Sequence, residues 1–259
     1  MKIALIGYGK MGKAIENIAR SRGHEITQII DSKSSISTLV KGKSDLAIEF
    51  TQPHLAVEHI QACLDLELPV VVGTTAWMEH LPNVQERVKT HDGSLFYASN
   101  FSLGVNLFNA LTKHLGTLFS AYPGYRFSME EIHHTEKLDA PSGTAITLAE
   151  TILESNPNYT DWTLEEGNRE ISANTLPIKA LRIPKVPGTH KIMVESDIDT
   201  ITLEHVAHNR EGFALGAVLA AEFLLDKKGI FTMNDLLKLK KIVEKNFEFV
   251  GKNFSNKVR

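Results

Sequence analysis

The first part of the chain alternates between short apolar runs and amphipathic segments. Five apolar runs have the length of buried parallel strands, at residues 2–7, 25–31, 46–50, 69–73 and 95–99. Apolar positions recur at helical spacing between them, which predicts helices over residues 11–22, 53–67 and 78–89, the last interrupted near Pro82. This alternation predicts an α/β fold with a doubly wound parallel sheet of the Rossmann type.

The pattern changes after Asn100, where strands and helices no longer alternate. Helices are expected over residues 105–119 and 143–154, and strands over residues 126–133, 179–183, 190–195 and 199–207. The stretch 156–176 is polar and is expected to be irregular. Strands grouped in this way predict a second, α+β domain with a mixed sheet.

Two further helices are expected near the end of the sequence, an apolar one over residues 213–227 and an amphipathic one over residues 232–246. Neither has a strand of its own to pack against, so both are expected to return to the first domain. The sequence therefore predicts one domain from residues 1–103 with 212–259 and another from residues 104–211.

A glycine-rich turn joins the first expected strand to the first expected helix. It has the form G-x-G-x-x-G and consists of Gly7, Tyr8, Gly9, Lys10, Met11 and Gly12. Its glycines would permit a tight turn, close backbone approach to a pyrophosphate and close helix–strand packing, and the helix N-terminus attracts negative charge. The alternative is a glycine turn without a ligand. The position of the motif in this fold favours a dinucleotide site.

Asp31 ends the second strand, where an acid accepts hydrogen bonds from the adenosine ribose. Ser32 follows in place of an arginine, and a carboxylate repels a 2′-phosphate, so NADH is expected to serve at least as well as NADPH. Lys33 could still accommodate the 2′-phosphate, so the sequence leaves open the use of both NADH and NADPH. Two loops at the ends of later strands could contact the cofactor or be ordinary turns: Gly73, Thr74 and Thr75, and Ala98, Ser99, Asn100 and Phe101.

Candidate catalytic groups are densest between residues 131 and 145. His133, His134 and Lys137 come at and just after the end of a strand, and Gly143 and Thr144 begin a helix whose N-terminus can hold an anion. The segment thus offers proton donors, a cation and a cradle for a carboxylate. Acid–base chemistry or anion binding is the preferred interpretation, ahead of structural histidines and then of a metal site.

The composition of the chain limits the classes of binding partner and the cellular compartment that are expected. The chain is 42% hydrophobic and 23% charged with a net charge of −3, which is ordinary for a globular protein and gives no general attraction for nucleic acid or anionic membranes. Glycines and a lysine break the apolar N-terminal stretch, unlike a signal peptide or a membrane span. Cys63 is the only cysteine, so a reducing, cytoplasmic compartment is expected.

A metal site is not expected from the sequence. One cysteine excludes a cysteine-rich zinc site, and the histidine pair at His133 and His134 would need further ligands. His205 and His208 are candidates, but they lie on opposite faces of a strand end, which makes a joint site awkward.

The segment from His133 to Ala145 resembles the signature H-H-x-x-K-x-D-x-P-S-G-T-A of the 4-hydroxy-tetrahydrodipicolinate reductases of bacterial lysine biosynthesis. The resemblance extends along nearly the whole chain. It includes the glycine-rich turn, the G-T-T and A-S-N-F loops, and a run H-x-A-x-x-R-x-x-F-x-x-G-A from His205 to Ala217. The chain departs from the family pattern between Arg182 and His190, where it is richer in proline.

The resemblance implies roles for individual residues. His133 would donate and accept protons, Lys137 would be a second donor and a cation for the substrate, and His134 would contact the substrate. Gly143 and Thr144 would bind a substrate carboxylate, and the glycine-rich turn, the acid after the second strand and the two loops would line the cofactor site. The family reduces an unsaturated cyclic dicarboxylate with NADH or NADPH, typically as a homotetramer built through the sheet of the second domain.

Two other functions fit part of the sequence. An amino-acid dehydrogenase of the aspartate or homoserine type would share the glycine motif, and a non-catalytic dinucleotide sensor would retain the glycines. Neither explains His133 and Lys137 beside the Pro-Ser-Gly-Thr run that ends at Thr144. A hydride-transfer assay with the dicarboxylate separates the three functions.

Overall fold

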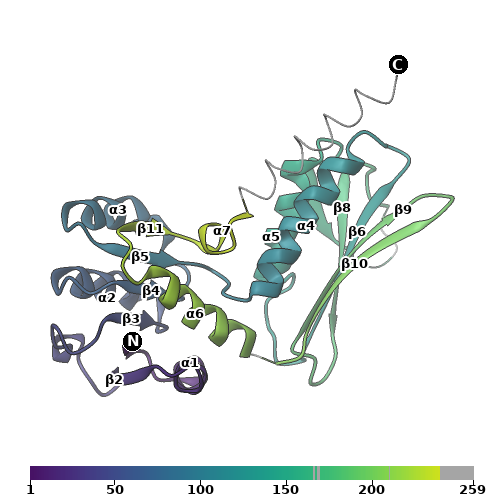
Figure 1. The fold of residues 1–259 in the computed structure, drawn as a ribbon. Helices are drawn as coiled ribbons and strands as arrows, with labels where there is room; N and C mark the ends of the chain where they lie inside the picture. The colour runs from purple at the N-terminus through teal and green to yellow at the C-terminus, as the bar shows by residue number, and fades with distance from the viewer. Residues whose placement is uncertain (166, 168–169, 210, 240–259) are drawn as a thin grey trace. The chain divides into compact units, whose positions relative to one another are not determined.

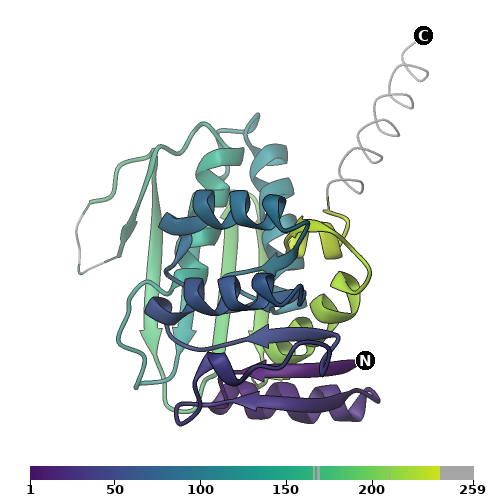
Figure 2. The same cartoon turned by 90° about the vertical axis from the view of Figure 1, so that its left-hand side faces the viewer.

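The structure, a computed structural model, describes residues 1–165, 167, 170–209 and 211–239. The described residues divide into two compact units (Figures 1 and 2). The first consists of Met1–Leu103 with the chain from Glu211 onward, and the second begins at Gly104. The chain therefore leaves the first unit and later returns to it.

A parallel six-stranded sheet forms the centre of the first unit, in the order β11-β5-β4-β3-β1-β2. Its strands are β1 (Lys2–Ile6), β2 (Glu25–Ile30), β3 (Leu46–Glu49), β4 (Val70–Val72), β5 (Ser94–Tyr97) and β11 (Gly229–Phe231). The chain moves from β1 to β2 on one side and then to β3 on the other. In such sheets, this change of direction marks the edge at which ligands bind.

Helices cover both faces of this sheet. They are α1 (Lys10–Ser21), α2 (Pro53–Asp65), α3 (Leu81–Thr90), α6 (Glu211–Leu224) and α7 (Met233–Leu236), with short 3₁₀ turns η1 (Ile36–Thr38) and η2 (Met78–His80). Strand residues alternate between the faces: Ile3 and Leu5 belong to the core beneath α1 and α6, and Ala4 and Ile6 to the core beneath α2 and α3. Both cores are fully buried, as expected of a doubly wound fold.

The return of the chain to the first unit includes one expected helix and one unexpected strand. The apolar helix α6 packs against α1 and the strands β3, β4 and β5. Strand β11 was not expected, because Gly229–Phe231 is too short to show a periodic pattern, but it pairs with β5. The helix expected over residues 232–246 is described only as α7; from residue 240 it lies outside the described residues.

The second unit contains a mixed sheet in the order β10-β9-β6-β8-β7. Its elements are α4 (Leu103–Phe119), β6 (Arg126–His133), α5 (Gly143–Ser155), β7 (Asp161–Leu164), β8 (Thr175–Arg182), β9 (Gly188–Glu195) and β10 (Thr200–Ala207). Strands β6, β8 and β7 run parallel, whereas β9 is antiparallel to β6 and β10. Phe127 and Met129 of β6 pack in a core with Phe108 of α4 and Leu148 of α5.

The expectation of an irregular stretch over residues 156–176 was wrong. It contains β7, and β8 begins at Thr175 rather than at residue 179. Strand β7 is only partly buried at the sheet edge, so its sequence lacks an apolar run. Pro177 obscured the start of β8, because proline lacks the N–H that an interior strand normally donates.

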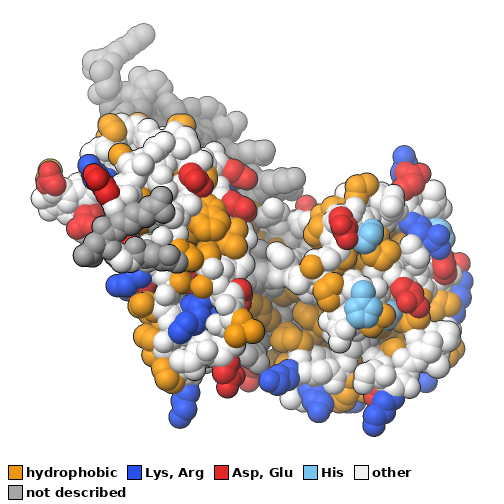
Figure 3. All heavy atoms as spheres, turned by 180° about the vertical axis from the view of Figure 1, so that it is seen from behind, with side chains coloured by type: hydrophobic (Ala, Val, Ile, Leu, Met, Phe, Trp, Pro, Cys, Tyr) orange, Lys and Arg blue, Asp and Glu red, His pale blue; other side chains and the backbone are white. Residues whose placement is uncertain are grey.

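The surface is mixed in character. Charged side chains of both signs are scattered among apolar ones on the face shown in Figure 3, in keeping with a net charge of −3. Among the described residues, no helix combines the length and the apolar character needed to cross a bilayer.

Candidate active site

The glycine-rich turn connects β1 to α1 at the carboxyl edge of the parallel sheet. Gly7 has a φ of +95°, and a Cβ there would lie 2.0 Å from the carbonyl oxygen of Phe50. A Cβ on Gly12 would lie 2.2 Å from the carbonyl oxygen of Gly7, whereas one on Gly9 would have no atom within 4 Å. Gly7 and Gly12 are thus needed for the fold of the turn, and Gly9 leaves the backbone open to a ligand.

Asp31 directly follows β2 at the same edge. Its Oδ1 accepts hydrogen bonds from the backbone N–H of Lys33 and the hydroxyl of Ser34, both at 2.9 Å. These hydrogen bonds lower the pKa of Asp31, so the carboxylate is ionised at neutral pH. Because both bonds use Oδ1, Oδ2 is the oxygen that could accept a hydrogen bond from a ribose hydroxyl.

The two loops that were predicted to contact the cofactor follow the adjacent strands β4 and β5. Thr74 is held in place: its hydroxyl accepts a hydrogen bond from the N–H of Thr51 at 2.7 Å, and its carbonyl accepts one from the indole of Trp77 at 2.8 Å. The buried ring of Phe101 packs against Phe50, with ring centroids 5.5 Å apart. Any contact of Phe101 with a cofactor would therefore come from its backbone.

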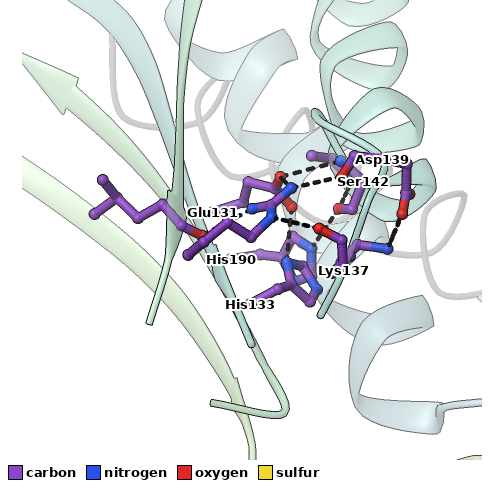
Figure 4. Close-up of polar contacts among 9 residues, drawn as sticks. Glu131, His133, Lys137, Asp139, Ser142 and His190 are labelled. Atoms are coloured by element: carbon purple, nitrogen blue, oxygen red, sulfur yellow. Dashed lines mark hydrogen bonds and ion pairs between the residues drawn. The ribbon is translucent and has the colours of Figure 1, made fainter. Parts of the chain in front are cut away.

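His133 ends β6 in the second unit and is buried among other polar side chains (Figure 4). Glu131, two residues earlier on the same face of β6, is 1% exposed. Glu131 Oε2 lies 2.9 Å from His133 Nδ1, an ion-pair distance without the straight alignment of a full hydrogen bond. His190 of β9 lies beside them, with its ring centroid 5.1 Å from that of His133.

The second oxygen of Glu131 has two donors. Glu131 Oε1 accepts from the backbone N–H of Ser142 and from the guanidinium of Arg182, each at 3.1 Å. Arg182 also donates to the carbonyl oxygens of Lys137 at 3.3 Å and Asp139 at 2.5 Å. Glu131 and Arg182 therefore connect the end of β6, the following loop and the start of α5.

The protonation states of two buried groups are set by their surroundings. Burial alone would raise the pKa of Glu131, but the contacts with His133, Ser142 and Arg182 outweigh it and lower this pKa to about 2. Burial, with the nearby His133, lowers the pKa of His190 to about 4. At neutral pH, Glu131 is an anion and His190 is neutral.

Lys137 lies in the loop between β6 and α5. Its Nζ donates to both carboxylate oxygens of Asp139, at 2.8 Å each. The ring of His134 is partly buried, and its Nδ1 has no hydrogen-bond partner among the residues that the structure describes. An anion that reached this loop could replace the carboxylate of Asp139 on Lys137.

The N-terminus of α5 has the form of an anion cradle. Ser142 is its N-cap, and the Ser142 hydroxyl accepts a hydrogen bond from the N–H of Ala145 at 3.2 Å. Gly143 is exposed, and no atom lies within 4 Å of the place where its Cβ would stand. Gly143 and Thr144 occupy the first positions of the helix, where the helix dipole favours negative charge.

The sequence missed Glu131, Arg182 and His190 as members of this site. One signal was present in the sequence, since Glu131 shares the face of His133 at a spacing of two, whereas the pairing of His190 of β9 with Glu131 is seen only in the structure. One ligand atom from each of Glu131, His133 and His190 lies within 4.8 Å of the others, a set that could hold a metal ion. However, the guanidinium of Arg182 already supplies positive charge to this carboxylate.

The structure collects His133, His134, Lys137, Gly143 and Thr144 in the second unit, and the predicted dinucleotide residues at one sheet edge of the first. A Rossmann-type unit combined with a cluster of histidine, lysine and carboxylate side chains at the start of a helix is an arrangement typical of a dinucleotide-dependent oxidoreductase. Comparison with known proteins gives the family.

The chain matches the family models described as dihydrodipicolinate reductase, N-terminus, over residues 1–101, and C-terminus, over residues 104–237. A 4-hydroxy-tetrahydrodipicolinate reductase from Christiangramia forsetii is 46% identical, covering 92% of this chain and 98% of its own length. A Staphylococcus aureus protein of the same name is 33% identical, covering 91% of this chain and 100% of its own. The chain belongs to the dihydrodipicolinate reductase family.

A solved structure supports the fold independently. The dipicolinate-bound dihydrodipicolinate reductase from Paenisporosarcina sp. TG-14 aligns with a TM-score of 0.69 at 23% identity, covering 90% of this chain and 97% of that one. The second family model extends to residue 237, although the structure places the chain from Glu211 onward in the first unit.

Proposed function

We propose that this protein reduces 4-hydroxy-tetrahydrodipicolinate to tetrahydrodipicolinate with hydride from NADH or NADPH, a step of lysine and diaminopimelate biosynthesis. The observation that carries the proposal is the combination of His133, Lys137 and the N-terminus of α5 in one unit of a chain whose other unit has a dinucleotide-binding turn. Membership of the dihydrodipicolinate reductase family supports it.

The residues of the first unit fit a dinucleotide. The backbone around Gly9 and the N-terminus of α1 would hold the pyrophosphate, and Asp31 the adenosine ribose. When bound, the cofactor supplies the hydride. Hydride transfer requires contact between the nicotinamide and the substrate.

The residues of the second unit fit a dicarboxylate. One substrate carboxylate would accept hydrogen bonds from Gly143 and Thr144 at the N-terminus of α5, where the helix dipole also favours negative charge. The second carboxylate would replace Asp139 as the ion-pair partner of Lys137, and His134 would lie beside it. These contacts fix the ring and make its unsaturated system a better hydride acceptor.

A proton must complete the reduction. Elimination of water removes the ring hydroxyl together with a hydrogen of the neighbouring ring carbon. Hydride then adds to the electron-poor ring carbon, and the displaced electron density is protonated. Glu131 is an anion and His190 is neutral near pH 7, so neither can deliver that proton. His133, adjacent to both, is the donor that this cluster offers, with Lys137 as a second.

The activity is tested by following NADH oxidation with substrate formed in situ from pyruvate and aspartate semialdehyde. Oxidation that requires the complete dicarboxylate supports the proposal. Oxidation with oxaloacetate and ammonia, or with aspartate semialdehyde alone, would assign the chain to an amino-acid dehydrogenase instead. Tight NADH binding without turnover of any of them would indicate a dinucleotide sensor.

The cofactor preference follows from Asp31. Its pKa is lowered by the hydrogen bonds from Lys33 and Ser34, so an ionised carboxylate would face any 2′-phosphate. We expect kcat/KM for NADH to equal or exceed that for NADPH, and Asp31→Ser to shift the ratio toward NADPH. Steady-state kinetics with both cofactors measure this; a preference of the parent enzyme for NADPH of several hundredfold would contradict it.

We further propose a cytoplasmic homotetramer assembled through the sheet of the second unit. The face of this sheet opposite α4 and α5 has partly exposed apolar side chains, including Ile132, Leu181, Met193 and Val206. Pairing two such faces would bury them. Sedimentation should give four times the chain mass of 28.8 kDa, and Val206→Asp should lower it; a 28.8 kDa species alone would contradict this assembly.

A further inference from the structure

The buried Glu131 has no direct place in the chemistry proposed above. It is an anion at neutral pH and lies in the interior of the second unit, 1% exposed. A buried charge is costly unless it is paired, and an apolar side chain of similar volume often stabilises a fold as well or better. The presence of a carboxylate at this position therefore points to a function other than packing.

The contacts of Glu131 are all with groups of the candidate active site. Oε2 lies 2.9 Å from Nδ1 of His133. Oε1 accepts from the N–H of Ser142, the N-cap of the helix that would hold a substrate carboxylate, and from Arg182, which binds the carbonyl of Lys137. One carboxylate therefore contacts the proposed proton donor and the N-cap of α5 directly, and it is connected to the backbone of Lys137 through Arg182.

The geometry around His133 also fixes which ring nitrogen can act. Nδ1 faces the carboxylate of Glu131. Nε2 is directed toward Gly188, where a Cβ would stand only 3.1 Å away. Glycine therefore leaves the space beside Nε2 uncovered, and Nε2 is the nitrogen that can reach a ligand.

We propose that Glu131 is the positioning residue of this reductase. Its carboxylate accepts a hydrogen bond from Nδ1–H of His133, so that Nε2 is the nitrogen that delivers the proton. The same carboxylate fixes the position of the start of α5. This proposal rests on the proposed function, in which His133 is the proton donor. The imperfect alignment of Nδ1 and Oε2 would straighten when the substrate orders the loop, as catalytic hydrogen bonds commonly do.

The charge of Glu131 has a consequence for pH dependence. The contact with His133 is among the causes that lower the pKa of Glu131, so the two groups attract each other. The other charged or titratable groups around this cluster are Arg182 of β8, His190 of β9, His205 of β10, and Lys137 and Asp139 of the loop. Because a proton donor works only while protonated, removal of the negative charge should cause activity to be lost at a lower pH than in the parent enzyme.

The test is the substitution Glu131→Gln, which retains the shape and an oxygen acceptor but removes the charge. We expect kcat to fall about 10- to 100-fold at neutral pH, and the basic limb of the kcat profile to move down by about one pH unit. NADH affinity should not change. The matched control is Glu154→Gln, at an exposed position of α5 in the same unit, which should leave both quantities at parental values.

A second variant keeps the test decisive if Glu131→Gln does not fold. Glu131→Asp retains the charge with a shorter reach, so kcat should fall while the pH profile keeps its parental midpoint. A parental kcat in Glu131→Asp, or an unshifted profile in a folded Glu131→Gln, would overturn the proposal. Activity lost on chelation and restored by Zn²⁺ would also overturn it, because Glu131, His133 and His190 would then be metal ligands.

The proposal and the proposed function can fail separately. If His133→Gln abolishes turnover but Glu131→Gln behaves like the parent, the role of Glu131 is wrong and that of His133 remains. If His133→Gln is itself fully active, the proton donor has been misassigned, and the role of Glu131 fails with it.

Discussion

Replacement of His133 by glutamine should lower kcat by about 10²- to 10⁴-fold, the usual cost of removing a positioned proton donor. Glutamine approximates the size of the ring, and its amide cannot supply a proton. Hydride transfer then lacks the protonation that completes it, whereas the dinucleotide-binding turn lies in the other unit and is unaffected.

Steady-state kinetics and an NADH titration measure both parts of this expectation. His208→Gln is the matched control, because it makes the same change at an exposed position in the second unit. A folded His133→Gln enzyme with near-parental kcat would show that His133 is a structural histidine. Loss of NADH binding in the same variant would show instead that NADH binding does not depend on the first unit alone.

Replacement of Lys137 by alanine should lower kcat/KM by about 10²- to 10⁴-fold, with a rise in KM and a fall in kcat. The ammonium both neutralises a substrate carboxylate and offers a second proton. Its removal should therefore weaken substrate binding and slow the chemical step. In the structure this ammonium is paired with Asp139, at 2.8 Å from each carboxylate oxygen. The substrate must therefore compete with an internal anion.

Because of this competition, substitutions of Lys137 and of Asp139 should change KM in opposite directions. Lys137→Ala should raise KM for the dicarboxylate, while Asp139→Asn, which frees the ammonium, should lower it. Lys113→Ala, at an exposed position of α4, is the control for loss of a lysine. An unchanged KM in Lys137→Ala would remove this residue from the substrate site.

The sequence predicted the parallel sheet well because its central strands are buried on both faces. Runs such as the apolar stretch of β1 (Lys2–Ile6) and that of β4 (Val70–Val72) have few alternatives to a strand between helices. Two of the edge strands, β11 and β7, were not predicted. The three residues of β11 and the half-exposed β7 acquire their structure from the neighbours with which they pair, and no local pattern reports that pairing.

The same contrast between local patterns and pairing of distant segments applies to the candidate site. His133, Lys137, Gly143 and Thr144 lie within one short segment, so a local motif identified them. Arg182 and His190 come from β8 and β9, and only the register of the mixed sheet places them beside Glu131. The metal-like arrangement of Glu131 and two histidines arises from the same register.

The central claim is that this chain transfers hydride to the cyclic dicarboxylate. The most direct test uses NADH carrying deuterium at C4 of the nicotinamide, prepared separately in its 4R and 4S forms, with substrate formed in situ. We expect that one form yields tetrahydrodipicolinate heavier by one mass unit, that the other yields unlabelled product, and that His133→Gln slows both. Labelled NADH that is bound but gives no deuterated product in either form would contradict it.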